Sequence, residues 1–172
     1  TAGREARYAF FNELKEKLGA NLIALAHNFN DQAETILMSI IRGTGMEGLR
    51  GIRPVRDGIY IRPILILTRE EIERYCELNN LKPRIDKSNF EKIYNRNKIR
   101  LELIPYLQEN FNKDILTTIN RLSEIISKDQ DYLEEVAEKK YVQYCSRLAE
   151  KVRLDQQLIK EHEAIVTRVI RR

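Results

Sequence analysis

Cysteine is scarce in this chain of 172 residues, in which only Cys76 and Cys145 occur. Neither has a second cysteine or a histidine at metal-ligand spacing, which argues against a zinc site and against a disulfide framework. Long apolar runs are also lacking: none approaches the roughly 20 residues of a membrane span, and there is no signal peptide. These absences predict a protein of the reducing cytoplasm that has no membrane partner.

Charged residues make up 33% of the chain and hydrophobic residues 42%, as in a globular protein with room for two small domains. The net charge of +4 is unevenly spread. Residues 82–100 include seven basic and two acidic residues, whereas residues 121–150 include five basic and seven acidic ones. We therefore expect a polyanion to meet the first of these segments.

The most informative stretch begins with a short apolar run. Residues 22–26 are continuously apolar, as in a strand buried on both faces of a parallel sheet, and the run ends at His27. Asn28 or Asn30 can then cap a helix. In open α/β sheets ligands bind at the carboxyl ends of such strands, so this junction is a candidate site.

The helix that follows should have two distinct faces. Helical spacing places on the buried stripe Ala33, Ile36, Leu37 and Ile40. The opposite face carries Asp31, Glu34, Thr35, Met38 and Arg42. An acidic start and a basic end therefore share one side of a single helix, and the helix dipole favours the acids at its start.

Glycines follow Arg42 at positions 43, 45, 48 and 51. Gly43 can simply end the helix, and the loop can be a flexible connector. The alternative is a loop whose backbone N–H groups cradle a phosphate, and glycine spacing alone does not decide between the two.

Short elements are expected on both sides of this stretch. An amphipathic helix over residues 1–18 should bury Ala6, Phe10, Phe11, Leu14 and Leu18. Strands are expected in residues 52–55 and 59–66, joined by a turn at Asp57-Gly58. Thr68 and Glu71 form a capping box for a helix that buries Ile72, Tyr75 and Cys76 and ends at Asn79-Asn80.

The basic segment contains two arginines on one predicted helical face. Arg96 and Arg100 are four residues apart, so together they could grip a phosphate. The alternative is a solvated basic face that pairs with Glu102 or Glu91.

The last third of the chain is helical by pattern. Apolar residues recur at helical spacing from residue 112 to 150, and a helix of that length should contain at least one break. Residues 151–154 suggest a short strand before Asp155, which can cap a last helix that buries Leu158, Ile165, Val166 and Val169. His162 is expected to be simply exposed.

Two motifs carry a family resemblance. The first is A-H-N-F-N-D-Q-A-E-T, followed by R-G-T-G-x-x-G-L-x-G, and the second is D-x-S-N, followed by Y-x-R-N-x-I-R and a proline. The second motif is matched by Asp86, Ser88, Asn89, Tyr94, Arg96, Asn97, Ile99, Arg100 and Pro105. In this order the motifs resemble those of tRNA(Ile)-lysidine synthetases, which are PP-loop (N-type) ATP pyrophosphatases. Where many members have a second histidine and a first aspartate, this chain has Asn28 and Asn30.

The resemblance implies a fold class, a domain order and a reaction. The fold class is α/β, a partial Rossmann-like PP-loop domain of the adenine-nucleotide α-hydrolase type, followed by a mainly helical region, so that this chain is predominantly helical. We expect a catalytic-domain part at 1–66, a helical extension with a basic segment facing tRNA or ATP at 67–110, and a helical domain at 111–172. The implied reaction is ATP-dependent ligation of free L-lysine to the wobble cytidine of tRNA(Ile) with a CAU anticodon.

The resemblance also implies site residues. Catalysis is assigned to Asp31, Glu34 and Arg96, with Asp31 also a candidate Mg²⁺ ligand. Nucleotide binding is assigned to His27, Arg42, Gly43, Thr44 and Gly45, and tRNA or phosphate binding to Arg96, Asn97 and Arg100. ATP and Mg²⁺ are the implied cofactors.

The pyrophosphate loop of the family, Ser-Gly-Gly-x-Asp-Ser, does not occur in these residues, so we expect the chain to be an inactive fragment whose open sheet edge allows a homodimer. Two other functions fit the residues. One is another PP-loop tRNA-modifying enzyme of the cytidine thiolase type, and the other is a tRNA-binding helical module without catalysis.

Overall fold

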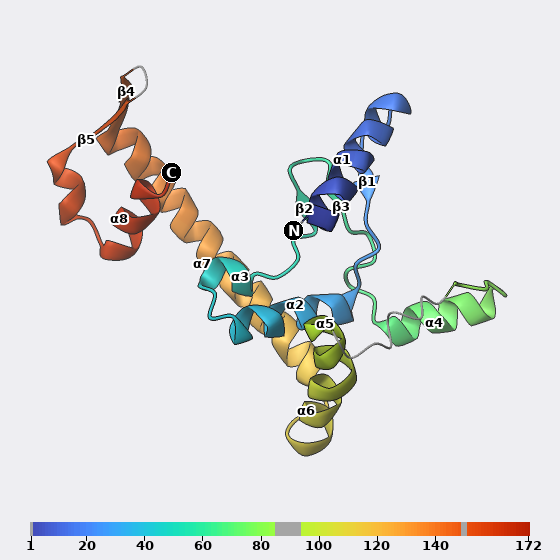
Figure 1. Cartoon of the computed structure of the whole chain (residues 1–172). Coiled ribbons are helices and arrows are strands. Elements are labelled where there is room, and N and C mark those ends of the chain that lie inside the picture. Colours follow the sequence, from blue (N-terminus) through green and yellow to red (C-terminus); the bar gives the residue numbers. More distant parts are fainter. Residues whose placement is uncertain (1, 85–93, 149–150) are drawn as a thin grey trace. The chain divides into compact units, whose positions relative to one another are not determined.

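The computed structural model describes residues 2–84, 94–148 and 151–172. The chain forms two compact units, Thr1–Ser123 and Glu124–Arg172, and each is described here by itself (Figure 1). None of the described helices is both long and apolar enough to cross a membrane. The domain boundaries expected at 66/67 and 110/111 stay predictions.

The first unit is mainly helical and contains one small mixed sheet, which confirms the predicted fold class. Its elements are α1 (Ala2–Lys17), β1 (Ile23–Ala24), α2 (Phe29–Ile41), α3 (Met46–Leu49), β2 (Val55–Arg56), β3 (Tyr60–Ile61), α4 (Arg69–Leu78), α5 (Asn95–Lys98), the π-helical turn η2 (Ile99–Leu103), α6 (Ile104–Asn110) and the start of α7 (Ile115–Tyr144). The strand order is β1-β3-β2, with β1 parallel to β3 and β2 antiparallel to it.

The prediction that β1 is buried on both faces is wrong. Ile23 and Leu25 are half-buried, whereas Ala24 and Ala26 are exposed. In the part of the chain that the structure describes, β1 pairs with a single strand and is covered on one face, so its burial alternates with the period of the strand.

Aromatic residues join α1 to the sheet. Tyr60 is almost fully buried, lies edge-on to Tyr8 with ring centroids 4.9 Å apart, and donates its hydroxyl to Asn12 at 2.6 Å. The expected burial of Ala6, Phe10 and Leu18 is wrong, since all three are exposed. Two-residue strands offer a narrow surface, and α1 therefore buries only a narrow face.

The core of the first unit is built around α2. Ala33, Ile36 and Leu37 pack with Ile99, Ile104 and Ile119, which confirms the predicted stripe except for the half-exposed Ile40. Burying each large aliphatic side chain stabilises the fold by roughly 2 kcal/mol. These contacts hold α2 firmly against the segment formed by α5, η2 and α6.

Both ends of α2 are closed by local hydrogen bonds. Asn28 accepts from Asp31 N at 2.9 Å, and Asp31 Oδ2 accepts from Asn28 N at 3.0 Å, a complete capping box. At the other end Gly43 adopts φ +68°, and its N–H and that of Thr44 donate back to Ile40 and Ser39. Asn30 has a separate role, because its Oδ1 accepts from the first N–H of α4, that of Arg69, at 3.0 Å.

Two further local predictions are confirmed and one is wrong. Asp57 and Gly58 both have positive φ (54° and 68°), as in the tight turn expected there. Thr68 and Glu71 form the predicted capping box of α4. Tyr75 of α4 is not buried but 64% exposed, because nothing among the described residues covers that face of the helix.

A π-helical turn separates α5 from α6. Ile104 N donates to Ile99 O, five residues back. Pro105 lacks an N–H and its ring crowds the carbonyl four residues earlier, so a regular α-helix cannot continue through this point. The widened turn contains Arg100, one of the predicted site residues. Asp86, Ser88 and Asn89 lie outside the described residues.

The second unit contains the rest of α7, the hairpin β4 (Cys145–Leu148) and β5 (Lys151–Leu154), the 3₁₀ helix η3 (Gln156–Lys160) and α8 (Glu163–Ile170). Its core is formed by Ala137, Leu158, Ile165 and Val169. The helical pattern expected over residues 112–150 is interrupted at Tyr144, where α7, one continuous helix of 30 residues, ends and β4 begins. Asp155 caps η3 rather than α8, and His162, expected to be only exposed, caps α8 by accepting from Ala164 N at 3.2 Å.

Within the second unit, a polar cluster links the segment between η3 and α8 to α7. The Glu161 carboxylate lies 2.6 Å from Lys140 Nζ and accepts from the Tyr144 hydroxyl at 3.0 Å. The hydrogen bond with Lys140 lowers the pKa of Glu161 and raises that of Lys140. Both groups therefore keep their charges over a wider pH range than free side chains.

Candidate functional site

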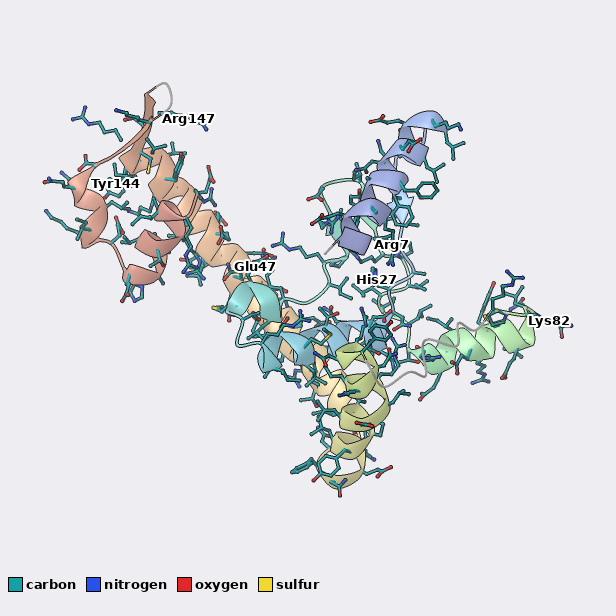
Figure 2. The ribbon with its side chains drawn as sticks, in the orientation of Figure 1. Arg7, His27, Glu47, Lys82, Tyr144 and Arg147 are labelled. Carbon is teal, nitrogen blue, oxygen red and sulfur yellow. The ribbon has the colours of Figure 1, made fainter. Side chains whose placement is uncertain are left out.

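A cavity of about 620 Å³ lies at the carboxyl end of β1. Its walls are Arg7, Tyr8, Phe11, Leu25, His27, Thr35, Glu47, Gly51, Ile52, Arg53, Arg56, Arg62 and Arg96. Figure 2 labels three of them, Arg7, His27 and Glu47. We call this space the arginine cavity, because five of its side chains are arginines and Glu47 is its single carboxylate.

Glu47 neutralises only part of this charge. Its carboxylate lies 2.6 Å from Arg53 and 3.5 Å from Arg50. Arg56 pairs with Asp57 at 3.0 Å and lies over the ring of Tyr8, 4.2 Å from its centroid. Among the described residues no carboxylate pairs with Arg7. The cavity is therefore cationic, and guanidinium groups of this kind suit planar or tetrahedral oxyanions.

Next to this cavity, four charged side chains from two segments form a closed cluster. Arg96 contacts Asp31 Oδ1 through Nη2 at 2.7 Å and Glu34 Oε2 through Nε at 2.6 Å. Arg100 contacts Glu34 Oε1 through Nε at 2.5 Å and Asp31 Oδ1 through Nη2 at 3.3 Å. Helix α2 supplies the two acids, and α5 with η2 supplies the two arginines. Arg96 belongs to both features, because it also lines the arginine cavity.

Glu34 is fully buried, although its helical position places it on the face opposite the predicted buried stripe. A buried carboxylate is tolerated only when charged or hydrogen-bonding partners compensate for its lost hydration. Arg96 and Arg100 provide that compensation. The hydrogen bond to Glu34 raises the pKa of Arg100 above its ordinary value, against the effect of burial.

The structure pairs Arg96 and Arg100 with other groups than the phosphate, Glu91 or Glu102 that their spacing suggested. Arg96 and Arg100 bind the acids of α2, 62 to 69 residues away in sequence. Asn97 between them is buried, with 8% of its surface exposed, which leaves little side chain for a tRNA phosphate to contact. Both oxygens of Glu34 are occupied, so a lysine ammonium could reach this carboxylate only if an arginine moved.

The predicted nucleotide-binding residues are not brought together. His27 lines the arginine cavity before the start of α2, whereas Arg42, Gly43, Thr44 and Gly45 follow its end. Fifteen residues at the helical rise separate His27 from Arg42 by roughly 20 Å. Arg42 instead lines a different cavity.

Four arginines of the cavity were missed by sequence reasoning: Arg7, Arg53, Arg56 and Arg62. The sequence contained a usable signal for three of them, because Arg53, Arg56 and Arg62 are clustered around the predicted Asp57-Gly58 turn. For Arg7 no local pattern indicated a site, since it lies in an amphipathic helix.

Gln32 links α2 to the wall of the arginine cavity. Its Nε2 donates to Arg50 O at 3.3 Å, and its Oε1 accepts from Ile52 N at 2.5 Å. Ser123 also donates to Arg50 O, at 2.8 Å. Gly51, between the two bonded residues, adopts φ +64°, and a Cβ there would lie 2.5 Å from Gln32 Oε1. The glycine loop is thus held by specific bonds and is not simply a flexible connector.

Gly51→Ala should lower the free energy of unfolding by roughly 2 to 3 kcal/mol, because the new methyl group adds a collision to an unfavourable positive φ. Urea unfolding of the wild type and the variant measures the loss. Gly19→Ala is the matched control: Gly19 has φ +62° but no atom within 4 Å of the added Cβ. Equal losses for both variants would contradict a specific contact with Gln32.

The comparison with known proteins decides the family. A model of the PP-loop domain matches residues 1–107. The chain belongs to the PP-loop domain family. This family implies the use of ATP, in accord with a cationic cavity at the end of a strand.

Several relatives of this PP-loop chain are tRNA(Ile)-lysidine synthases. It is 57% identical over 171 residues to tRNA(Ile)-lysidine synthase of Clostridium acetobutylicum, covering 99% of the chain and 37% of the relative. It is 55% identical to that of Clostridium perfringens, covering 99% of the chain and 36% of the relative. For that of Clostridioides difficile the identity is 51%, with 98% and 37% covered. The predicted resemblance is confirmed, and the chain spans a little over one third of these relatives.

The described residues do not by themselves fit a Mg²⁺ site. Among them no group of three potential metal-binding side chains is found. The two carboxylates of the cluster are occupied by guanidinium groups, and Asp31 Oδ2 also accepts from a backbone N–H. The described part of this PP-loop domain therefore offers no complete set of protein ligands for Mg²⁺.

Proposed function

We propose that this chain is part of a tRNA(Ile)-lysidine synthase. The enzyme would join lysine to C2 of the wobble cytidine in tRNA(Ile) with a CAU anticodon. In the first step the C2 carbonyl oxygen attacks the α-phosphorus of ATP, pyrophosphate leaves, and an adenylated cytidine forms. In the second step the ε-amine of lysine attacks C2, the C–O bond breaks, AMP leaves, and the amine loses a proton.

The observation that carries this proposal is the convergence of five arginines and His27 at the carboxyl end of β1. Both steps develop negative charge on phosphate oxygens, first on pyrophosphate and then on AMP. Fixed cations around a partly enclosed cavity stabilise such charge without reorganisation at the moment of reaction. We assign this role to Arg7, Arg53, Arg56 and Arg62, with His27 at the nucleotide.

The Asp31–Glu34 pair supports the second step. An attacking amine must be neutral, so a lysine ammonium must give up a proton to a nearby base. Asp31 is 15% exposed and reaches Arg96, which lines the cavity. We assign to Asp31 the role of accepting the proton from the lysine ammonium. We assign to Glu34 the role of holding the two arginines, or of holding the ammonium when one arginine turns toward a phosphate. Arg96 would then connect the amine-handling acids to the phosphate-handling cations.

Several finer assignments rest on this proposal. ATP and Mg²⁺ remain the proposed cofactors, and Mg²⁺ would arrive bound to the ATP phosphates. A tRNA substrate implies the cytoplasm. We also propose that the chain is divided into a catalytic-domain part at 1–66, a helical extension that faces tRNA or ATP at 67–110, and a helical domain at 111–172. A homodimer is a further proposal.

The decisive test is incorporation of labelled lysine into a transcript of isoleucine tRNA with a CAU anticodon. The full-length protein is incubated with ATP and lysine, and a transcript with a CAC anticodon serves as control. We expect label in the CAU transcript together with equimolar AMP. Binding of tRNA without any transfer of lysine would contradict the proposal and favour a binding module.

A cytidine thiolase is the second candidate from the same superfamily. Such enzymes usually carry cysteines near the active site. Cys76, the cysteine of the first unit, is not among the residues that line the arginine cavity. In the second unit, burial raises the pKa of the Cys145 thiol, which makes it less reactive. These observations favour lysine transfer.

A further inference from the structure

A second cavity, of about 570 Å³, lies between the C-terminal half of α2 and the segment formed by α5, η2 and α6. It is lined by Met38, Ile41, Arg42, Asn95, Lys98, Ile99, Glu102, Leu103 and Tyr106. None of these residues lines the arginine cavity. Its size is typical of small-ligand sites.

Its chemistry is divided between apolar walls and a charged rim. Met38, Ile41, Ile99 and Leu103 are apolar, and Tyr106 is 55% exposed at the edge. Two cationic side chains, Arg42 and Lys98, also line this cavity. Within the described ranges no ion pair joins either of them to a carboxylate.

Asn95 and Glu102 add groups that can exchange hydrogen bonds with a flat polar ring. With two cations and a single carboxylate, the lining keeps a net positive charge. An aromatic ring, apolar walls, hydrogen-bonding groups and cations together match one unstacked nucleotide. The walls and Tyr106 would take the base, and the cations would take the phosphate.

We propose that the second cavity binds a single unstacked nucleotide of an RNA chain, and that this nucleotide is not the one that reacts. The inference rests on the proposed function for the identity of the RNA. The reacting nucleotide belongs at the arginine cavity, and Arg42 lies roughly 20 Å from His27 along α2. The second cavity would therefore bind the RNA at a nucleotide that is distant from the reacting cytidine.

This placement gives a role to Arg42, which the arginine cavity leaves unused. The same short segment serves both sites: Arg96 and Arg100 meet the acids of α2, and Lys98 and Glu102 line the second cavity. A bound nucleotide would thus contact the segment that positions Arg96.

The experiment uses the full-length protein and the CAU-anticodon transcript. Lys98→Gln removes a cation, Tyr106→Leu removes the stacking ring, and Lys113→Gln removes an exposed lysine that lines neither cavity. Dissociation constants are measured at several salt concentrations. We expect Lys98→Gln to weaken binding several-fold and reduce the salt slope by about one. Tyr106→Leu should weaken binding roughly tenfold with an unchanged slope, and Lys113→Gln should bind like wild type.

A second readout does not depend on affinity. 2-Aminopurine, placed in turn at each anticodon-loop position except the wobble cytidine, should be quenched at one position by the wild type and not by Tyr106→Leu. The inference would be overturned if Lys98→Gln and Tyr106→Leu both bound RNA with wild-type affinity and both kept the wild-type quenching. It would also be overturned if these two variants and Lys113→Gln lost equal affinity for RNA. Another protein segment covering the cavity would produce the first of these results.

The outcomes for the two proposals are distinguishable. If the wild type transfers lysine but the cavity variants bind RNA normally, only the second-cavity inference fails. If the variants lose RNA binding as expected but the wild type transfers no lysine, the cavity stands and the proposed reaction fails.

Discussion

Asp31→Asn in the full-length protein should reduce lysine incorporation by at least roughly 100-fold while the dissociation constant for tRNA changes less than twofold. Asp31 is the partly exposed acid of the cluster, and its Oδ1 receives Nη2 groups of both Arg96 and Arg100. An amide cannot accept the proton of an attacking ammonium at neutral pH, and positioned acid–base groups typically contribute 10²- to 10⁴-fold.

The measurement pairs single-turnover lysine transfer with tRNA binding. Asp129→Asn is the control, because Asp129 is an exposed acid of α7 outside the cluster. A large loss of tRNA binding in Asp31→Asn would contradict the assignment and point to a structural defect. Wild-type transfer rates would contradict it as well.

Glu34→Gln should lower the free energy of unfolding by about 2 to 4 kcal/mol, the larger of the two stability effects predicted here. The substitution keeps the shape of the side chain but leaves Arg96 and Arg100 against a neutral amide in a buried position. The arginines are 37% and 23% exposed, so water recovers part of the cost.

Urea unfolding measures this loss, and a double variant with Arg100→Gln tests its origin. If the cost comes from unpaired charge, the double variant should lose less than the sum of the two single variants. Glu135→Gln is a matched control, because Glu135 pairs with Lys139 at 2.6 Å on an exposed helix surface. A loss in Glu34→Gln no larger than that of Glu135→Gln would contradict a buried ionic cluster.

Local signals in the sequence were sufficient where the interacting groups are close along the chain. The predicted capping box at Thr68/Glu71 acts across three residues, and it forms. At the start of α2 the sequence left Asn28 and Asn30 open as caps, and the structure shows Asn28 in that role. The Asp57-Gly58 turn and the end of α2 at Gly43 follow in the same way, from the backbone angles that these residues allow.

Burial was harder to predict, because it depends on which surface arrives from elsewhere in the chain. Phe10 and Leu18 have the spacing of a buried face, yet they are exposed because the sheet beneath α1 is narrow. Glu34 lies opposite the predicted buried stripe, yet it is fully buried because the α5–η2 segment packs there.

The sequence by itself determined the presence of α2 and α4, the capping box of α4, the hairpin turn and the family, since these depend on neighbouring residues or on motifs read directly from the chain. Only the tertiary structure decided the site. It joins Glu34 to Arg100 across 66 residues, gathers arginines from α1, the β2–β3 region and α5 around one cavity, and assigns Arg42 to another. Contacts between charges so far apart in sequence leave no periodic pattern, because their geometry is set by how the core packs and not by any local spacing.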